Sequence, residues 1–327
     1  MQLDQTHVTI RARSLTEICD LATAMIRCYP VAVIVGFVAG AVPWAIANSL
    51  LLGSIPLEEF RIGAFDEDMD LNLSRYQIFM AMLVFLQTPA AGALTTLYIG
   101  QAVFESRPTW ASVAAEVRKL APRWLWELGV VRGPVILMAV IAVTSGPNVS
   151  YEIDYFWPVV IVLLYLLVRS IRPFMPEILL LERCPLRSPK ASPVITASRR
   201  SAALHKPIAG ELFGRYIAIS IAMVAIAGLS FYSLLWLRGV LFGLWEWDLW
   251  VYLVLYPVAL WSAAAFSVIV RFLSYLDTRI RLEGWEVQLS VLAETIRQFG
   301  EEEKVTTLPD AVLPTTTVPA RQLENVP

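Results

Sequence analysis

The sequence has little charge for its length. Asp, Glu, Lys and Arg together make up 17% of the 327 residues, whereas soluble globular proteins carry about 25% charged residues. Hydrophobic residues make up 57%, which exceeds the roughly 45 to 50% of soluble proteins. This composition excludes an ordinary soluble domain and predicts an integral membrane protein.

Residues that usually carry chemistry are also scarce. The chain has three cysteines and two histidines, and they do not have the spacing of a metal site. The sequence contains no glycine-rich phosphate loop and no Ser/His/Asp arrangement. We therefore expect no enzymatic activity, no metal, no cofactor and no nucleic-acid partner. Residues 1–29 hold no early apolar run with a small-residue cleavage site, so we expect no cleaved signal peptide.

Long apolar stretches are what the sequence does have. A membrane-crossing helix needs about 20 mostly apolar residues. Stretches of this kind lie near 30–53, 77–104, 124–146, 155–172 with an extension toward 182, 214–238 and 249–275. We therefore predict an all-α integral membrane protein with about six transmembrane helices.

Basic residues are distributed unevenly between the connecting segments. Of the 26 Lys and Arg residues, the segments after the first, third and fifth spans and their approaches hold only Arg61, Arg75 and Arg238. Cytoplasmic loops are enriched in Lys and Arg. The pattern thus predicts a protein of the cytoplasmic (inner) membrane with both termini in the cytoplasm, where the three cysteines would stay reduced.

Amphipathic segments precede three of the spans. Residues 14–28, 108–122 and 193–206 place apolar side chains on one helical face, and Pro30, Pro122 and Pro207 are expected to break these helices. Each segment leads into a span, an outer loop and a returning span. This order favours three repeats of an interfacial helix plus a transmembrane hairpin. The alternative is that any six-span protein has short amphipathic links.

A fourth amphipathic segment follows the last span, near residues 276–299. We therefore predict one six-span transmembrane domain over residues 1–299. The remaining segment, 300–327, is polar and contains several prolines, which is typical of a disordered cytoplasmic tail.

Charged residues gather at the cytoplasmic ends of the third and fourth spans. Arg169 and Arg172 approach the interface, where long basic side chains can reach water, and Pro173 and Pro176 kink the chain after them. The stretch EILLLE is then expected to be a short helix at or just beneath the inner surface, with Glu177 near enough to pair with Arg172 or Arg169.

The third span also carries two charged residues, Glu127 and Arg132, and either of them can face a partner on the fourth span. The candidate charge cluster is therefore Glu127, Arg132, Arg169, Arg172 and Glu177. One interpretation is an intramembrane charge site, since ions in hydrocarbon are costly and usually functional. The other is a structural clamp at the interface.

The segment that leaves the last span carries a second set of charges. Asp277 and Arg281, and then Arg279 and Glu283, stand four residues apart and can pair on one helix face. Such pairs usually indicate a solvated helix face. The full C-terminal motif is Tyr275, Asp277, Arg279, Arg281, Glu283, Gly284 and Trp285.

This motif, with Leu289 after it, resembles the ending of uncharacterised bacterial multi-pass membrane proteins, including those similar to the membrane domain attached to some glycerophosphodiester phosphodiesterases. RPFMPEILLLER and SRRSAALHKPIAGELFGR also look like inner-loop signatures of such proteins. The resemblance implies a six-span membrane domain and brings no activity. With only two histidines in these 327 residues, we expect no phosphodiesterase domain among them.

Two functions fit these observations. A membrane scaffold or assembly partner without catalytic activity would explain the many inner helices, and its partners would be the lipid bilayer and other membrane proteins. The alternative is a transporter or lipid-handling protein that uses the inner-face charge cluster.

Overall fold

The described residues fold entirely into helices. The structure is a computed structural model, and it describes residues 13–62, 67–103, 108–144, 151–187 and 195–284, among which no strand is present. Three helices are long and apolar enough to cross a membrane: Pro30–Leu52, Ala197–Phe242 and Val251–Glu283. Two bent helix pairs raise this to five if each pair is one span. A shorter apolar helix covers Tyr155–Ile171.

The first third of the chain forms an amphipathic helix followed by an apolar hairpin. Helix α1 (Leu15–Cys28) ends just before Pro30, which opens α2 (Pro30–Leu52). After α3 (Ser54–Ile62), the chain returns through α4 (Glu67–Ala91) and α5 (Ala93–Ala102). The predicted helix over 14–28 and the break at Pro30 are confirmed. Ser14 and Glu17 form a capping box that fixes the start of α1.

The middle third repeats the order with two irregular helices. Helix α6 (Trp110–Trp124) continues through Pro122 into the π-helix η2 (Leu125–Val131) and then α7 (Pro134–Thr144). The chain returns through α8 (Tyr151–Ile171) to the short α9 (Met175–Leu180). The predicted break at Pro122 is therefore wrong. The helix bends by 45° further along, between Val131 and Pro134.

The last third holds the two longest helices. Helix α10 (Ala197–His205) joins α11 (Ala209–Phe242) through a 3-10 turn, η3 (Lys206–Ile208). The α-helix is therefore interrupted at Pro207, where the sequence predicted a break. The return consists of the π-helix η4 (Val251–Leu255) and α12 (Tyr256–Glu283). The predicted amphipathic helix near 276–299 begins as the end of α12. Its residues from 285 onward, and the predicted tail, lie outside the described residues.

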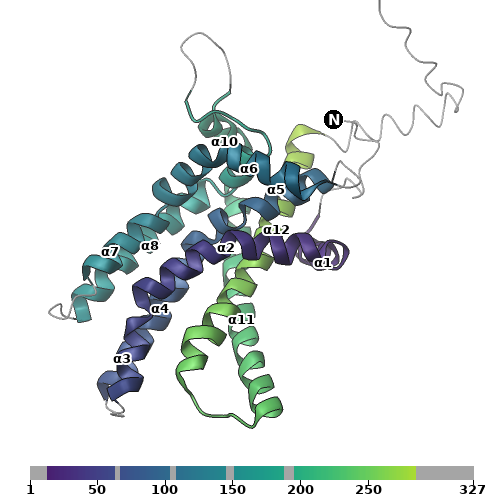
Figure 1. Ribbon diagram of the computed structural model, residues 1–327. Coiled ribbons are helices and arrows are strands. Elements are labelled where there is room, and N and C mark those ends of the chain that lie inside the picture. Colours follow the sequence, from purple (N-terminus) through teal and green to yellow (C-terminus); the bar gives the residue numbers. More distant parts are fainter. Residues whose placement is uncertain (1–12, 63–66, 104–107, 145–150, 188–194, 285–327) are drawn as a thin grey trace, which may run out of the picture.

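The two ends of the bundle differ in character (Figure 1). The turns of the α11–α12 hairpin and the free ends of α3 and α7 lie at one end, whereas α6 and α10 lie at the other. We name the second end, with α1, α6, α9, α10 and the last turns of α12, the polar end. Apolar side chains face outward along the bundle, and Leu50 is 82% exposed. An outward apolar surface of this kind is what a protein embedded in a lipid bilayer requires.

Two buried clusters hold the bundle together. One packs α1, α9 and α10 against α12 and includes Ile18, Ile178 and Phe272. The other packs α2, α4 and α7 against α12 and includes Phe37, Phe79 and Leu137. Helix α12 belongs to both clusters, so charges on α12 can meet groups from almost every other element.

Candidate functional site

Arg132 lies at the bend between η2 and α7, within the third predicted span. Gly133 has a φ of +96°, and an added Cβ would come within 2.3 Å of the Tyr165 ring on α8, so this break needs glycine. The bend directs the Arg132 side chain to α8, where its guanidinium donates to the Arg172 carbonyl at 2.5 Å. Arg132 is only 3% exposed. The prediction that Arg132 faces the fourth span is confirmed.

Arg169 points into the bundle. It is 6% exposed, donates to the Phe85 carbonyl at 2.6 Å and to the Leu86 carbonyl, and lies over the Phe85 ring. Pro89 lies four residues after Phe85 inside α4 and has no N–H, so the Phe85 carbonyl lacks its usual helical donor. The predicted path of Arg169 to water at the interface is wrong, because this carbonyl draws the side chain inward.

Glu177 is fully buried in α9. Its Oε1 accepts from Nε of Arg271 on α12 at 2.7 Å, whereas its Oε2 has no partner within the described chain. The expected pairing with Arg172 or Arg169 is therefore wrong. All six residues of α9 are buried. The predicted short helix exists, but it packs inside the polar end, where it can meet α12.

Positive charge exceeds negative charge in this buried region. Arg132 lies within electrostatic reach of Glu127, Arg271 and Glu177. Arg169 lies within reach of Tyr216, Arg132 and Arg271. The structure thus brings three guanidinium groups near one another, and one of them, Arg271, pairs with the buried Glu177 carboxylate. We name Arg132, Arg169, Glu177, Tyr216 and Arg271 the buried charge cluster.

Several polar atoms of the buried charge cluster have no hydrogen-bond partner in the part of the chain that the structure describes. They are Nε of Arg169, Oε2 of Glu177, the Tyr216 hydroxyl and one terminal nitrogen of Arg271. Native proteins pair most buried polar atoms, so a group of unpaired ones needs an explanation. Together they offer three donors and one acceptor to a polar ligand.

The two other predicted residues lie beside this cluster. Glu127 and Arg172 line a cavity of about 660 Å³ at the polar end. Glu127 is half-buried and Arg172 is exposed. Of the five predicted residues, the structure therefore places Arg132, Arg169 and Glu177 in the interior, with Glu127 and Arg172 at its edge.

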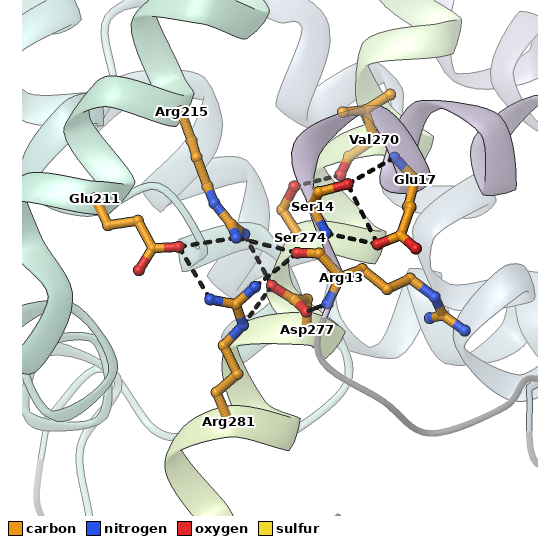
Figure 2. A network of polar contacts seen from close by, with 9 residues as sticks. All are labelled: Arg13, Ser14, Glu17, Glu211, Arg215, Val270, Ser274, Asp277 and Arg281. Carbon is orange, nitrogen blue, oxygen red and sulfur yellow. Dashed lines mark hydrogen bonds and ion pairs between the residues drawn. The ribbon is translucent and has the colours of Figure 1, made fainter.

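The C-terminal motif forms two ion networks, the first around Asp277 (Figure 2). Asp277 is 2% exposed. Its Oδ2 pairs with Arg215 of α11 at 2.8 Å and with Arg281 at 3.1 Å. Its Oδ1 accepts the backbone N–H of Arg13 at 2.7 Å, and the Arg13 carbonyl accepts from Arg281 at 2.6 Å. One carboxylate thus fixes the start of α1 and α11 on α12.

The second network lies on the other side of the motif. Glu182 accepts two hydrogen bonds from Arg200 of α10, at 2.6 and 2.9 Å, and a third from the Tyr275 hydroxyl at 2.6 Å. Glu283 pairs with Arg200 and, at 2.7 Å, with Arg279. The α12 helix then ends at Gly284, with a φ of +67°. Trp285 lies outside the described residues.

The predicted pairs Asp277–Arg281 and Arg279–Glu283 are therefore confirmed. Their expected position on a solvated helix face is wrong. The motif holds the start of α1 and helix α10 against α12. The sequence reasoning did not include Arg271, Tyr216, Glu182 or Arg200 in any site. Arg271 had a recognisable signal, since it is a charged residue within a long apolar stretch.

The chemistry of the buried charge cluster favours binding an anion. It has no nucleophile with an adjacent base, and among the described residues no group of three or more His, Cys, Asp or Glu side chains is placed to hold a metal ion. Comparison of the chain with family models, with curated proteins and with solved structures finds no match.

Proposed function

We propose that the chain is a multi-pass protein of the inner membrane with six spans and both termini in the cytoplasm. This count starts from the three long helices and the two bent pairs and adds the shorter apolar helix Tyr155–Ile171 as a sixth span. The polar end carries most of the arginines, which supports a cytoplasmic position for it. The resemblance to uncharacterised bacterial multi-pass membrane proteins stays a prediction.

We infer that the protein is not an enzyme and that it transports or holds an anionic lipid or solute. One observation carries this inference: Arg132, Arg169 and Arg271 lie within electrostatic reach of one another in the interior, where the fully buried Glu177 carboxylate pairs with Arg271. Buried charges in a membrane protein are costly unless they are paired or used. An anion would neutralise the excess positive charge and accept from the unpaired donors of Arg169, Tyr216 and Arg271.

Glu177 would act as the internal counter-anion whenever no other anion is bound. It holds Arg271 with one oxygen only, so an entering anion can compete with it for the guanidinium. Release of the anion would restore the Glu177–Arg271 pair. This exchange gives the carboxylate a role in transport that a purely structural clamp lacks.

A scaffold role has less support from the geometry. Scaffold helices must offer their apolar faces to a partner, but α1 buries Ile18, Ala22 and Met25 against the rest of the chain. Helices α6 and α10 also bury residues of their apolar faces, such as Val113 and Leu204. The amphipathic helices are therefore used mainly within the polar end itself.

Purification from the native membrane in a mild detergent, followed by mass spectrometry of all retained molecules, tests the proposal. We expect an anionic lipid or small anion at a stoichiometric ratio and no stoichiometric protein partner. A stoichiometric protein partner without such an anion would contradict our proposal and favour the scaffold.

Two substitutions separate an anion site from a clamp. Arg271→Gln should lower the retained anion about tenfold or more, since hydrogen bonds to charged groups are strong. Glu177→Gln should retain the anion but slow its release, because the competing carboxylate is gone. Arg27→Gln is the matched control, as Arg27 is exposed on α1 at the same end. If Arg271→Gln and Glu177→Gln only lower the amount of folded protein and leave the retained anion per protein unchanged, the clamp interpretation is correct.

A further inference from the structure

The cavity beside the buried charge cluster is a distinct feature of the polar end. It has a volume of about 660 Å³ and lies between the α6–η2 helix, the turn from α8 into α9, residues 185–187 and the start of α10. Its charged lining residues are Arg123, Glu127, Arg172 and Arg187. The volume is within the range of ordinary ligand pockets.

The three arginines of the cavity are free of protein partners in the described residues. Arg123, Arg172 and Arg187 are exposed and donate to no side chain or carbonyl of this part of the protein. Elsewhere at the polar end, Arg200, Arg215 and other arginines are paired with carboxylates. Three unpaired guanidinium groups around one cavity form a set of donors that matches phosphate oxygens.

The cavity wall also has an apolar side. Trp126 and Val131 of η2 line the cavity, and they are 58% and 43% exposed. Leu125, which precedes Trp126 on the same π-helix, is a further exposed apolar residue. Tryptophan favours the membrane interface, where its ring meets lipid and water together. A ligand that fits both sides has a charged head and an apolar body.

Glu127 narrows the choice of head group. It is the one acidic residue among the described residues of the lining, and it would repel a second negative charge while accepting a hydrogen bond from a hydroxyl group. The lining therefore suits a phosphodiester with a hydroxylated substituent. Anionic glycerophospholipids with a glycerol head group have this chemistry.

We propose that this cavity binds the phosphodiester head group of an anionic glycerophospholipid. Arg123, Arg172 and Arg187 would hold the phosphate, Glu127 would accept from a head-group hydroxyl, and Trp126 would contact the upper part of an acyl chain. The inference rests on the proposed function, since it names the anion that the protein handles. The Arg172 carbonyl accepts from Arg132, which links the cavity to the buried charge cluster.

Native mass spectrometry of the full chain, titrated with phosphatidylglycerol, phosphatidylcholine and inorganic phosphate, tests the assignment. We expect one tightly bound phosphatidylglycerol and at least about tenfold weaker binding of phosphatidylcholine, which lacks net charge. Inorganic phosphate should compete poorly because it has no apolar body. Competition by inorganic phosphate at equal affinity would show a simple anion site and overturn the lipid assignment.

A double substitution, Arg123→Gln with Arg187→Gln, should weaken phosphatidylglycerol binding by about tenfold for each arginine removed. The double variant Arg27→Gln with Arg118→Gln is the control, because it removes the same charge from exposed sites of α1 and α6. Unchanged binding in the cavity variant, with an unchanged elution profile, would overturn the proposal.

Arg271→Gln distinguishes this proposal from the proposed function. If the cavity variant loses the lipid but Arg271→Gln neither loosens it nor lowers the retained anion, the cavity assignment stands and the transport role of the buried cluster fails. If only Arg271→Gln loosens the lipid, the cavity assignment fails and the buried cluster remains the anion site.

Discussion

Arg215 and Asp277 form an ion pair of 2.8 Å between α11 and α12, and the Asp277 side chain is almost completely buried. The same carboxylate holds the backbone N–H of Arg13, so it connects three segments that are far apart in the sequence. Removal of one partner of a buried ion pair is strongly destabilising, because the remaining charge is left without compensation.

Asp277→Asn should therefore lower the free energy of unfolding by about 3 kcal/mol. Arg215 and Arg281 would lose their buried counter-charge, and the start of α1 would lose a strong acceptor. Thermal unfolding in detergent measures the effect. Glu211→Gln is the control, since Glu211 pairs with the same two arginines but is 43% exposed, and we expect a change below about 1 kcal/mol. Equal losses for both variants would contradict the assigned role of Asp277.

Asn48 of α2 and Gln87 of α4 form a second buried polar contact. Both side chains are completely buried, and their amides exchange two hydrogen bonds of 2.8 and 2.7 Å. Asn48→Leu leaves Oε1 of Gln87 without a donor and its Nε2 with only the weak acceptor Sδ of Met138, at 3.6 Å, which should cost about 1 to 2 kcal/mol. The double variant with Gln87→Leu should recover much of this loss, because both polar groups are then absent.

A double-mutant cycle, measured by denaturant unfolding in mixed micelles, checks this prediction. A coupling free energy between Asn48 and Gln87 that is indistinguishable from zero would show that the two hydrogen bonds do not stabilise the fold.

Gly40 of α2 lies where the backbones of α2 and α4 pass very close to each other. An added Cβ would lie 2.0 Å from the Ala91 carbonyl oxygen of α4, so the backbones must separate to admit a methyl group. Gly40→Ala should destabilise the protein by about 1 to 3 kcal/mol. Gly228→Ala is the matched control, because nothing lies within 4 Å of its added Cβ, and it should be neutral or slightly stabilising. Unfolding temperatures that fall equally for both variants would exclude close packing as the cause.

The positions of the helices follow largely from the sequence, because each apolar run must satisfy its own backbone hydrogen bonds in a membrane. The positions of the bends cannot be predicted from the apolar runs alone. Gly92 and Gly133 interrupt helices where Val268 and Tyr165 of neighbouring helices come close, and this proximity depends on the tertiary arrangement. The partner of Glu177 also depends on the tertiary arrangement, because Arg271 is 94 residues away in the chain.

One feature of the site had a recognisable signal in the sequence. Pro89 within an apolar run leaves the carbonyl of Phe85 without its helical donor, and a buried arginine is a suitable replacement. That Arg169 of α8 supplies it depends on how α8 packs against α4, which the spacing of residues along the chain does not specify. The sequence therefore predicted three members of the buried charge cluster, Arg132, Arg169 and Glu177, but not Tyr216, Arg271 or the partner of Glu177.

The cysteines test the orientation of the polar end. Cys28 is exposed at the end of α1, whereas Cys19 and Cys184 are partly buried. Burial raises the pKa of the Cys184 thiol above its ordinary value, and the Glu182 carboxylate beside it raises the pKa further. The thiolate is the reactive form, so a raised pKa lowers the reactive fraction at neutral pH.

Membrane-impermeant maleimide should therefore label Cys28 first at pH 7, and labelling of Cys184 should accelerate as the pH rises toward 9 and beyond. If the polar end is cytoplasmic, Cys28 reacts in inverted membrane vesicles and stays unlabelled in intact spheroplasts. Cys28→Ser should abolish the fast phase and leave the slow one, as a control for assignment. Fast labelling of Cys28 in intact spheroplasts would reverse the proposed orientation, and with it the side from which an anionic lipid reaches the cavity.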